Sequence, residues 1–164
     1  MEGLKNLIKQ QDEYETYKTK KSQQLADHVD HLKYIVTTKL LELCEDWDHS
    51  ISEPNTLIFN YKELSISIQI INPITETRKE KEYNLSQRVS ERLKMVINVS
   101  KKQGSKDFSY TIEDKTQYKK DGPYIYEIDT QAGPERSEDF LYLLDRCFSH
   151  IHNLKVDFIS NSVF

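Results

Sequence analysis

The chain has 164 residues, of which 23 are basic and 27 acidic, and 37% of all residues are hydrophobic. This composition is typical of one folded domain and not of a disordered chain. No apolar run approaches the roughly 18 residues of a membrane span, and the first residues lack the apolar core of a signal peptide. We therefore expect a cytoplasmic protein with no membrane partner.

The stretch from Leu4 to Trp47 contains neither proline nor glycine, and its second half has the spacing of an amphipathic helix. Apolar side chains recur there at steps of three or four residues: Leu25, Val29, Leu32, Val36, Leu40, Leu43 and Trp47. Such steps place these side chains on one side of a helix. We expect this side to cover a sheet, with Trp47 beside Phe59.

The first half of this stretch is more polar. Its apolar side chains are Leu4, Leu7, Ile8, Tyr14 and Tyr17. A helix over the whole stretch would be about 66 Å long, whereas a compact domain of this size is about 40 Å across. The helix is therefore expected either to break near residues 18–24 or to project beyond the domain.

We divide the chain into a projecting helical segment, residues 1–24, and a single α+β domain, residues 25–164. A projecting helix with sparse apolar positions is typical of contacts with another chain. The five apolar side chains of the segment are thus predicted to bind another protein or to form a homodimer. A solvated extension and a helix folded back as a hairpin are the alternatives.

After the helix, the period of the apolar residues changes from 3.6 to 2, which predicts strands. Five strands are expected, at residues 57–61, 64–70, 93–99, 108–113 and 124–130. Ser137 is expected to cap a second helix, whose apolar stripe covers residues 140–151. The order predicts an α+β fold: a long N-terminal helix, an antiparallel meander of about five strands and a C-terminal helix, with both helices on one face of the sheet.

Two segments stay ambiguous. The charged residues 75–90 are compatible with a loop, a strand extension or a short helix, and the tail at 156–164 with a sixth strand or an apolar arm. The cysteines, Cys44 and Cys147, lie in apolar helical stripes and are predicted to be reduced, buried thiols. Alanine occurs only at positions 26 and 132, a usage typical of an AT-rich bacterial or phage genome.

Two sequence patterns raise the possibility of metal chemistry. His28 and His31 are three residues apart, a spacing that allows two imidazoles on one helix face to share a metal ion. Glu113-Asp114-Lys115 matches the short E-x-K element of metal-dependent nucleases, with Asp129 or Asp107 as the second carboxylate. The simpler interpretations are histidines at the edge of a solvated face and charged residues at a solvated strand end.

Lysines gather in the predicted loops, at Lys101, Lys102, Lys106, Lys115, Lys119 and Lys120. Lysines that meet phosphates, with tyrosines that stack on bases, would form a nucleic-acid surface. Acidic residues interrupt these runs and the formal net charge of the chain is −4, so a solubilising surface explains them equally well.

Neither a nucleophile elbow nor a phosphate-binding glycine loop is present in the sequence, because glycine occurs only at positions 3, 104, 122 and 133. We expect no cofactor. The sequence favours a small non-enzymatic protein that binds another protein, of the inhibitor, immunity or antitoxin-like, phage-antagonist or chaperone-like adaptor kind. A nucleic-acid-binding protein and a metal-dependent hydrolase or nuclease are the alternatives.

Overall fold

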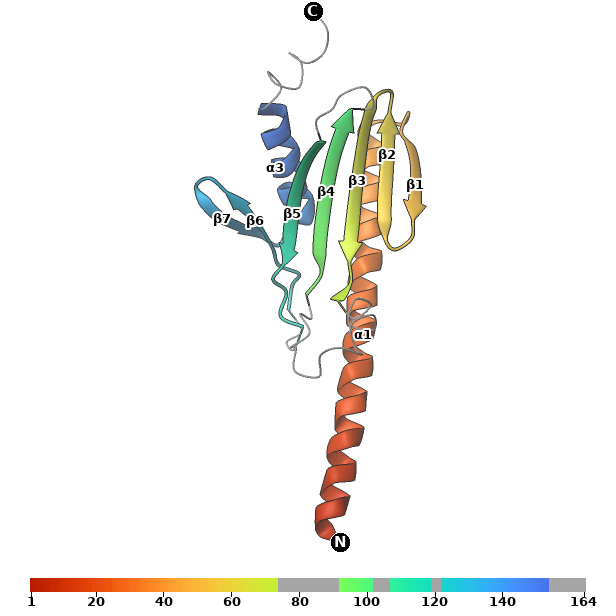
Figure 1. The fold of residues 1–164 in the computed structure, drawn as a ribbon, viewed down its shortest axis with the longest axis vertical. Helices are drawn as coiled ribbons and strands as arrows, with labels where there is room; N and C mark the ends of the chain where they lie inside the picture. The colour runs from red at the N-terminus through yellow and green to blue at the C-terminus, as the bar shows by residue number, and fades with distance from the viewer. Residues whose placement is uncertain (74–91, 102–106, 119–121, 154–164) are drawn as a thin grey trace, which may run out of the picture.

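The computed structural model describes residues 1–73, 92–101, 107–118 and 122–153. They form a two-layer α+β fold, with a sheet in one layer and two helices in the other (Figure 1). The elements are α1 (Glu2–Leu43), β1 (Asp48–Ser52), β2 (Thr56–Tyr61), β3 (Leu64–Ile71), β4 (Lys94–Lys101), β5 (Asp107–Asp114), β6 (Tyr126–Thr130), β7 (Gly133–Ser137) and α3 (Phe140–Asn153). The predicted fold class is confirmed. The ambiguous segments, 75–90 and 156–164, lie outside the described residues.

Helix α1 is one continuous helix of 42 residues, and it does not break near residues 18–24. At about 1.5 Å per residue it is about 63 Å long. Its second half lies behind the sheet, whereas its first half extends past the end of the strands (Figure 1). The helix ends at Leu43, earlier than the predicted stretch to Trp47, because Cys44 already has an extended backbone, with φ −153° and ψ 116°.

The sheet has seven antiparallel strands in the order β1 to β7, so the prediction of a meander is confirmed and the count of about five is two too low. The missed strands are the two edges, β1 and β7. Every residue of β1 is exposed, and β7 begins with Gly133-Pro134, so neither edge has the alternation of buried residues that identifies a strand. Only two residue pairs, Glu113 with Glu127 and Asp114 with Tyr126, join β5 to β6.

The core lies between the sheet and the two helices. Alternate residues of the central strands face it, as the period of two requires. Its buried members on α1 are Leu25, Val29, Leu32, Val36 and Leu40, on the central strands Leu57, Phe59, Ile66, Ile68, Ile70, Met95, Ile97, Val99 and Ile112, and on α3 Phe140, Leu143, Leu144, Cys147 and Ile151. The opposite face of the sheet carries short polar side chains such as Ser65, Ser67 and Asn98 and is covered by neither helix.

Three local predictions have different outcomes. Trp47 packs edge-on against Phe59 with ring centroids 6.0 Å apart, as predicted, although it lies in the turn after α1 and is half-buried. Cys147 is buried and Cys44 half-buried, and both are free thiols. The N-cap residue of α3 is Asp139, whose carboxylate accepts a hydrogen bond from the Tyr142 amide at 3.2 Å, while the hydroxyl of Ser137, the predicted cap, accepts one from the Asp139 amide at 3.0 Å. In the part of the chain that the structure describes, no helix is long and apolar enough to cross a membrane.

The role of α1 as the cover of the sheet predicts a contrast between its two sides. Leu32 is fully buried, so Leu32→Ala should lower the free energy of unfolding by about 2–5 kcal/mol by opening a cavity. Tyr34 is 71% exposed on the same helix, and Tyr34→Ala should change it by less than about 0.5 kcal/mol. Urea unfolding measures the loss of free energy of unfolding in both variants, and equal losses would contradict the packing of the apolar stripe of α1 against the sheet.

Candidate functional site

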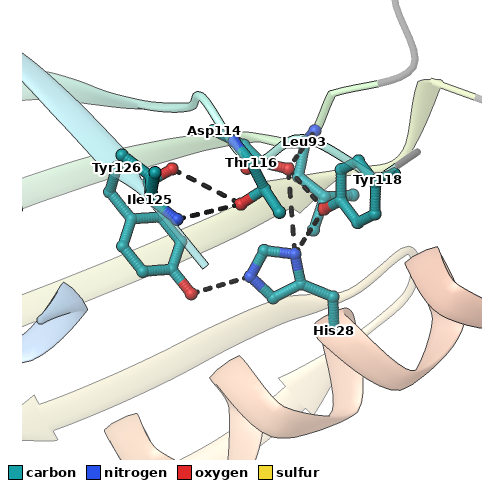
Figure 2. A network of polar contacts seen from close by, with 7 residues as sticks. All are labelled: His28, Leu93, Asp114, Thr116, Tyr118, Ile125 and Tyr126. Atoms are coloured by element: carbon teal, nitrogen blue, oxygen red, sulfur yellow. Dashed lines mark hydrogen bonds and ion pairs between the residues drawn. The ribbon is translucent and has the colours of Figure 1, made fainter. Parts of the chain in front are cut away.

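The most unusual feature of the core is a buried polar network that links α1 to the segment around β5 and β6 (Figure 2). His28 comes from α1, and its side chain is fully buried. Asp114 ends β5, Tyr118 follows in the connection to β6, and Tyr126 begins β6. These four side chains, which we call the His28 network, meet where the projecting part of α1 leaves the domain.

The direction of each hydrogen bond in the His28 network follows from its donors. Tyr118 donates its hydroxyl proton to Asp114 Oδ2, at 2.5 Å. The Tyr118 oxygen must therefore accept from His28, which places the imidazole proton on Nδ1. Nε2 of the neutral ring is left as an acceptor, and Tyr126 donates to it at 2.7 Å. The chain of donors runs from Tyr126 through His28 and Tyr118 to the carboxylate.

Asp114 is held in place by backbone groups as well. Its Oδ2 accepts a hydrogen bond from the Leu93 amide at 3.1 Å, and its Oδ1 accepts one from the Thr116 amide at 2.9 Å. With the Tyr118 hydroxyl, three donors surround a carboxylate that is 1% exposed. Buried charges are tolerated only when they are satisfied in this way. The network is thus anchored to the entry of β4 and to the connection after β5.

The surroundings shift the pKa values of the network strongly. Burial lowers the pKa of His28 to about 4, although the carboxylate of Asp114, 3.7 Å from Nδ1, acts in the opposite direction. Burial, reinforced by Asp114, raises the pKa of Tyr118 far above its usual value. Tyr126 is raised for the same two reasons. At neutral pH the histidine is therefore uncharged and both tyrosines are protonated.

A small hollow of about 170 Å³ lies beside the network. Tyr124 forms part of its lining and stacks flat on the His28 ring, with centroids 3.8 Å apart and planes 5° apart. Gln24 and Asp27 of α1 line the other side. The hollow is smaller than the roughly 300–1,000 Å³ of typical ligand pockets. Both imidazole nitrogens of His28 are already occupied by tyrosine hydroxyls, so the ring offers no free atom toward this space.

The His28 network connects elements of the fold and presents no free reactive group. A general base needs a free lone pair within reach of a substrate, and here the accepting lone pair of the imidazole, on Nε2, and the protons of both tyrosine hydroxyls already have partners. What the network does is fix α1 against β5 and β6 by bonds that require one register. It therefore sets the position at which the first half of the helix leaves the domain.

The two predicted metal ligands have different environments. His28 belongs to the network, whereas His31 is exposed and its ring is tilted by 35° from that of Tyr124, with centroids 5.4 Å apart. A metal ion on His28 would have to displace a tyrosine hydroxyl. Among the residues that the structure describes, no group of three or more His, Cys, Asp or Glu side chains is placed to hold a metal ion.

The E-x-K element is divided between two environments. Asp114 points into the core, while Glu113 is exposed and forms an ion pair with Lys115 at 3.0 Å. Lys115 also lies 4.0 Å from Glu127 of the neighbouring strand. Glu113 and Asp114 thus face opposite sides of the sheet edge. Of the two carboxylates predicted to complete the motif, Asp107 begins β5, at the far end of the strand from Glu113, and Asp129 lies two residues beyond Glu127, which pairs with Glu113.

The predicted lysine surface falls mostly outside the described residues. This applies to Lys102, Lys106, Lys119 and Lys120, and Lys101 ends β4. Lys115 is described, and its ammonium is paired with carboxylates. The nucleic-acid interpretation stays a prediction.

The predicted protein-binding residues lie on the first half of α1, and all are exposed. The exposed fractions are 48% for Leu4, 63% for Leu7, 55% for Ile8, 57% for Tyr14 and 40% for Tyr17. Every residue from Met1 to Lys20 is exposed to solvent. This part of α1 therefore presents several large apolar side chains on a helix that extends past the sheet (Figure 1).

Comparisons with protein-family models, with curated proteins and with solved structures give no match for this chain.

The sequence interpretation missed the His28 network, because its members are up to 98 residues apart. One signal was present. His28 lies inside the apolar stripe of α1, beside Val29 and between the buried positions Leu25 and Leu32. A polar residue at such a position requires a buried partner, but the sequence does not say which one.

The lowered pKa of His28 predicts a defined dependence of stability on pH. Between the folded value of about 4 and the unfolded value of 6.5, the unfolded chain binds a proton that the folded chain does not. The contribution of the uncharged His28 ring to the free energy of unfolding is therefore complete above pH 6.5. It decreases by about 3 kcal/mol as the pH falls toward 4. Urea unfolding at pH 7 and pH 4 should show the stability difference between the native chain and His28→Gln shrinking by that amount.

The matched control for this effect is Thr38→Gln, an exposed position on the same helix with no titratable side chain. Its pH dependence should follow that of the native chain. Parallel curves for the native chain and His28→Gln would mean that the buried ring does not govern stability in this range.

The anchoring of Asp114 predicts a second contrast. Asp114→Asn replaces one acceptor oxygen with a donor amide among three donors, which should lower the free energy of unfolding by about 2–4 kcal/mol. Glu113→Gln, at the exposed neighbouring position, should cost less than about 1 kcal/mol. Thermal and urea unfolding compare the two, and a small loss in Asp114→Asn would argue against the three hydrogen bonds to the Asp114 side chain as an anchor of the network.

Proposed function

We propose that this protein is a small non-enzymatic binding protein, which acts by presenting the first half of α1 to another protein. The observation that carries this proposal is the exposure of Leu4, Leu7, Ile8, Tyr14 and Tyr17 on a helix that extends past the sheet. Soluble proteins rarely expose neighbouring large apolar side chains without use, and tyrosine and leucine supply the area that protein interfaces need.

The energetics of the segment point the same way. Ordering a residue costs about 1–2 kcal/mol in backbone entropy, and an isolated helix in water is marginal at this length. The packed second half of α1 removes the cost of nucleation, yet residues 2–20 gain no burial of their own in the domain. Binding a partner would bury their apolar side chains, and the free energy gained by this burial would offset the entropic cost of ordering the segment.

Two further observations fit this class of function. The His28 network has all of its polar groups occupied, and the adjoining hollow is small, so this buried polar cluster fits a role in rigidity. The two cysteines are free thiols, which agrees with the proposed place of action in the reducing cytoplasm.

The test is a deletion combined with a point variant. Removal of residues 2–20 should leave the thermal transition of the domain nearly unchanged, because these residues make no part of the core. The deletion should also abolish retention of the partner when the chain is used as bait in affinity enrichment from the organism that encodes it. Leu7→Asp should reduce that retention at least tenfold, and Tyr34→Asp, an exposed position on the second half of α1, should not.

Retention of the same partner by the native chain, by the deletion and by Leu7→Asp would contradict the proposal. A large fall in the thermal transition on deletion would show instead that residues 2–20 serve the stability of the domain.

A further inference from the structure

Strand β5 is paired along only part of one of its two edges. On one side β4 pairs with it from Asp107 to Glu113, whereas on the other side β6 pairs only with Glu113 and Asp114. Beyond these two pairs, β6 and β7 turn away from β5 (Figure 1). We call the β6 side of residues 107–112 the open edge of β5.

The backbone groups that point to the open edge follow from the end of the strand. The Lys115 amide donates to the Ile125 carbonyl, just before β6, at 2.7 Å. Alternate residues of a strand direct their N–H and C=O groups to the same side, so Thr111 and Ser109 also direct theirs toward the β6 side. Within the described part of the chain, no backbone group pairs with these two residues there.

The apolar side chains of β5 are less buried than those of its neighbour. Ile97 and Val99 of β4 are 0% and 4% exposed, whereas Tyr110 and Phe108, which pair directly with them, are only half-buried. The two strands differ in that β4 has a neighbour on both sides and β5 has one on a single side over these residues. The dry layer of the sheet is therefore unfinished at the open edge.

A buried polar atom lies beside the same strand. The ring of His150 in α3 is within 18° of parallel to that of Tyr110, with centroids 6.0 Å apart, and its Nε2 is buried with no hydrogen-bond partner among the described residues. Buried polar atoms of folded proteins are nearly always paired. The imidazole and the open edge thus both call for one more segment of chain at this place.

Helix α3 leads the chain to the open edge. Phe140, at its start, packs against Tyr126, which pairs with the last residue of β5. His150, near its end, lies by Tyr110 in the middle of β5, so α3 runs opposite to β5 and ends near the beginning of that strand. Eleven residues, 154–164, follow in the sequence and lie outside the described residues.

The sequence of these eleven residues begins in the manner of a strand. Val156, Phe158 and Ile159 are residue types that strands favour, and Asp157 separates the first two, so one side of such a strand would be apolar. Residues 154 and 155 are enough for the connection, since helix-to-strand loops commonly have about two to six residues. Residues 156–160 then match the length of the open edge.

We propose that residues 156–160 pair with the open edge as a strand parallel to β5. Phe158 would lie beside Tyr110 on the core side, and Asp157 beside Ser109 on the polar face. Such a strand would follow β7 and α3 with β6 between, and with the helices behind the sheet as in Figure 1 this crossover is right-handed, the sense of about 98% of such connections. It would close the edge to strands of other chains.

The argument for this occupant over another chain is its position. An extended segment of another protein, or β5 of a second copy, could use the same backbone groups. Residues 156–160 are attached two residues from the end of α3, however, and a short linker raises the effective concentration of a segment to the order of millimolar. The chain's own segment is therefore favoured unless its side chains do not fit.

Hydrogen exchange detected by NMR tests the pairing at single amides. In the full chain the Ser109 and Thr111 amides should exchange at least tenfold more slowly than in a chain without residues 154–164. The Tyr110 and Ile112 amides, which point to β4, are the internal control and should be equally protected in both. Phe158→Asp should reproduce the effect of the deletion, and Ile159→Asp, on the polar face, should not. Unprotected Ser109 and Thr111 amides in the full chain would overturn the proposal.

A disulfide tests which segment occupies the edge. Ser109→Cys combined with Asp157→Cys, in a Cys44→Ser background, should oxidise to a disulfide within one chain, because neighbouring strands bring such side chains within bonding distance. Ser67→Cys with Asp157→Cys is the control, since Ser67 faces the same side two strands away, and it should remain reduced. Equal oxidation of both pairs, or a disulfide that joins two chains, would contradict pairing by the chain's own segment.

Discussion

Burial of one stripe of α1 against the sheet is the interaction on which the rest of the structure depends. Leu25, Leu32 and Val36 lie at its centre and are at most 1% exposed. Each buried aliphatic side chain of this size contributes about 1.5–3 kcal/mol from the apolar surface removed from water. The strands have a second face that stays wet, so without this helix the part of the sheet that α1 covers would have no dry side. The stripe stops at Leu25, and the helix continues into solvent with no further burial except that of Lys21.

The His28 network turns this apolar contact into a specific one. Apolar packing alone tolerates small shifts of a helix along a sheet, whereas hydrogen bonds through both imidazole nitrogens do not. Asp114 ties the same group to the amides of Leu93 and Thr116. Since His28 lies one turn from Leu25, the network is placed where the buried part of α1 gives way to its exposed part. It holds the base of the projecting segment rigid, and in the function proposed above this rigidity would lower the entropic cost of binding through that segment.

Much of the fold could be predicted from the sequence, because local periodicity encodes it. The steps of three and four residues identified α1, and the alternation in residues such as Ile66, Ile68 and Ile70 identified the central strands. The edge strands β1 and β7 could not be found in this way. They bury almost nothing, so nothing in their sequence alternates, and hydrogen bonds to one neighbour hold them.

The candidate functional residues likewise fall into one group that the sequence could predict and one that it could not. The exposed residues of α1, such as Leu7 and Tyr14, could be named from the sequence because they lie on one helix and lack the density of a core stripe. The His28 network could not, because its members come from three elements and meet only through the β5–β6 pairing. The prediction of a metal site at His28 and His31 has the same limit. A spacing of three residues shows that two histidines share part of a helix, but it does not show which side chains from other elements face them.

The central claim is that residues 4–17 of α1 are a binding surface and not a solvated extension. Hydrogen exchange of the native chain, compared without and with the protein that it retains in affinity enrichment, tests it most directly, because an unpartnered helix opens easily and a paired one does not. We expect the amides of residues 4–17 to exchange more slowly when that protein is added, while those of residues 25–43 are protected equally in both samples. Exchange of residues 4–17 that is unchanged on addition of any protein retained by the chain would contradict the claim.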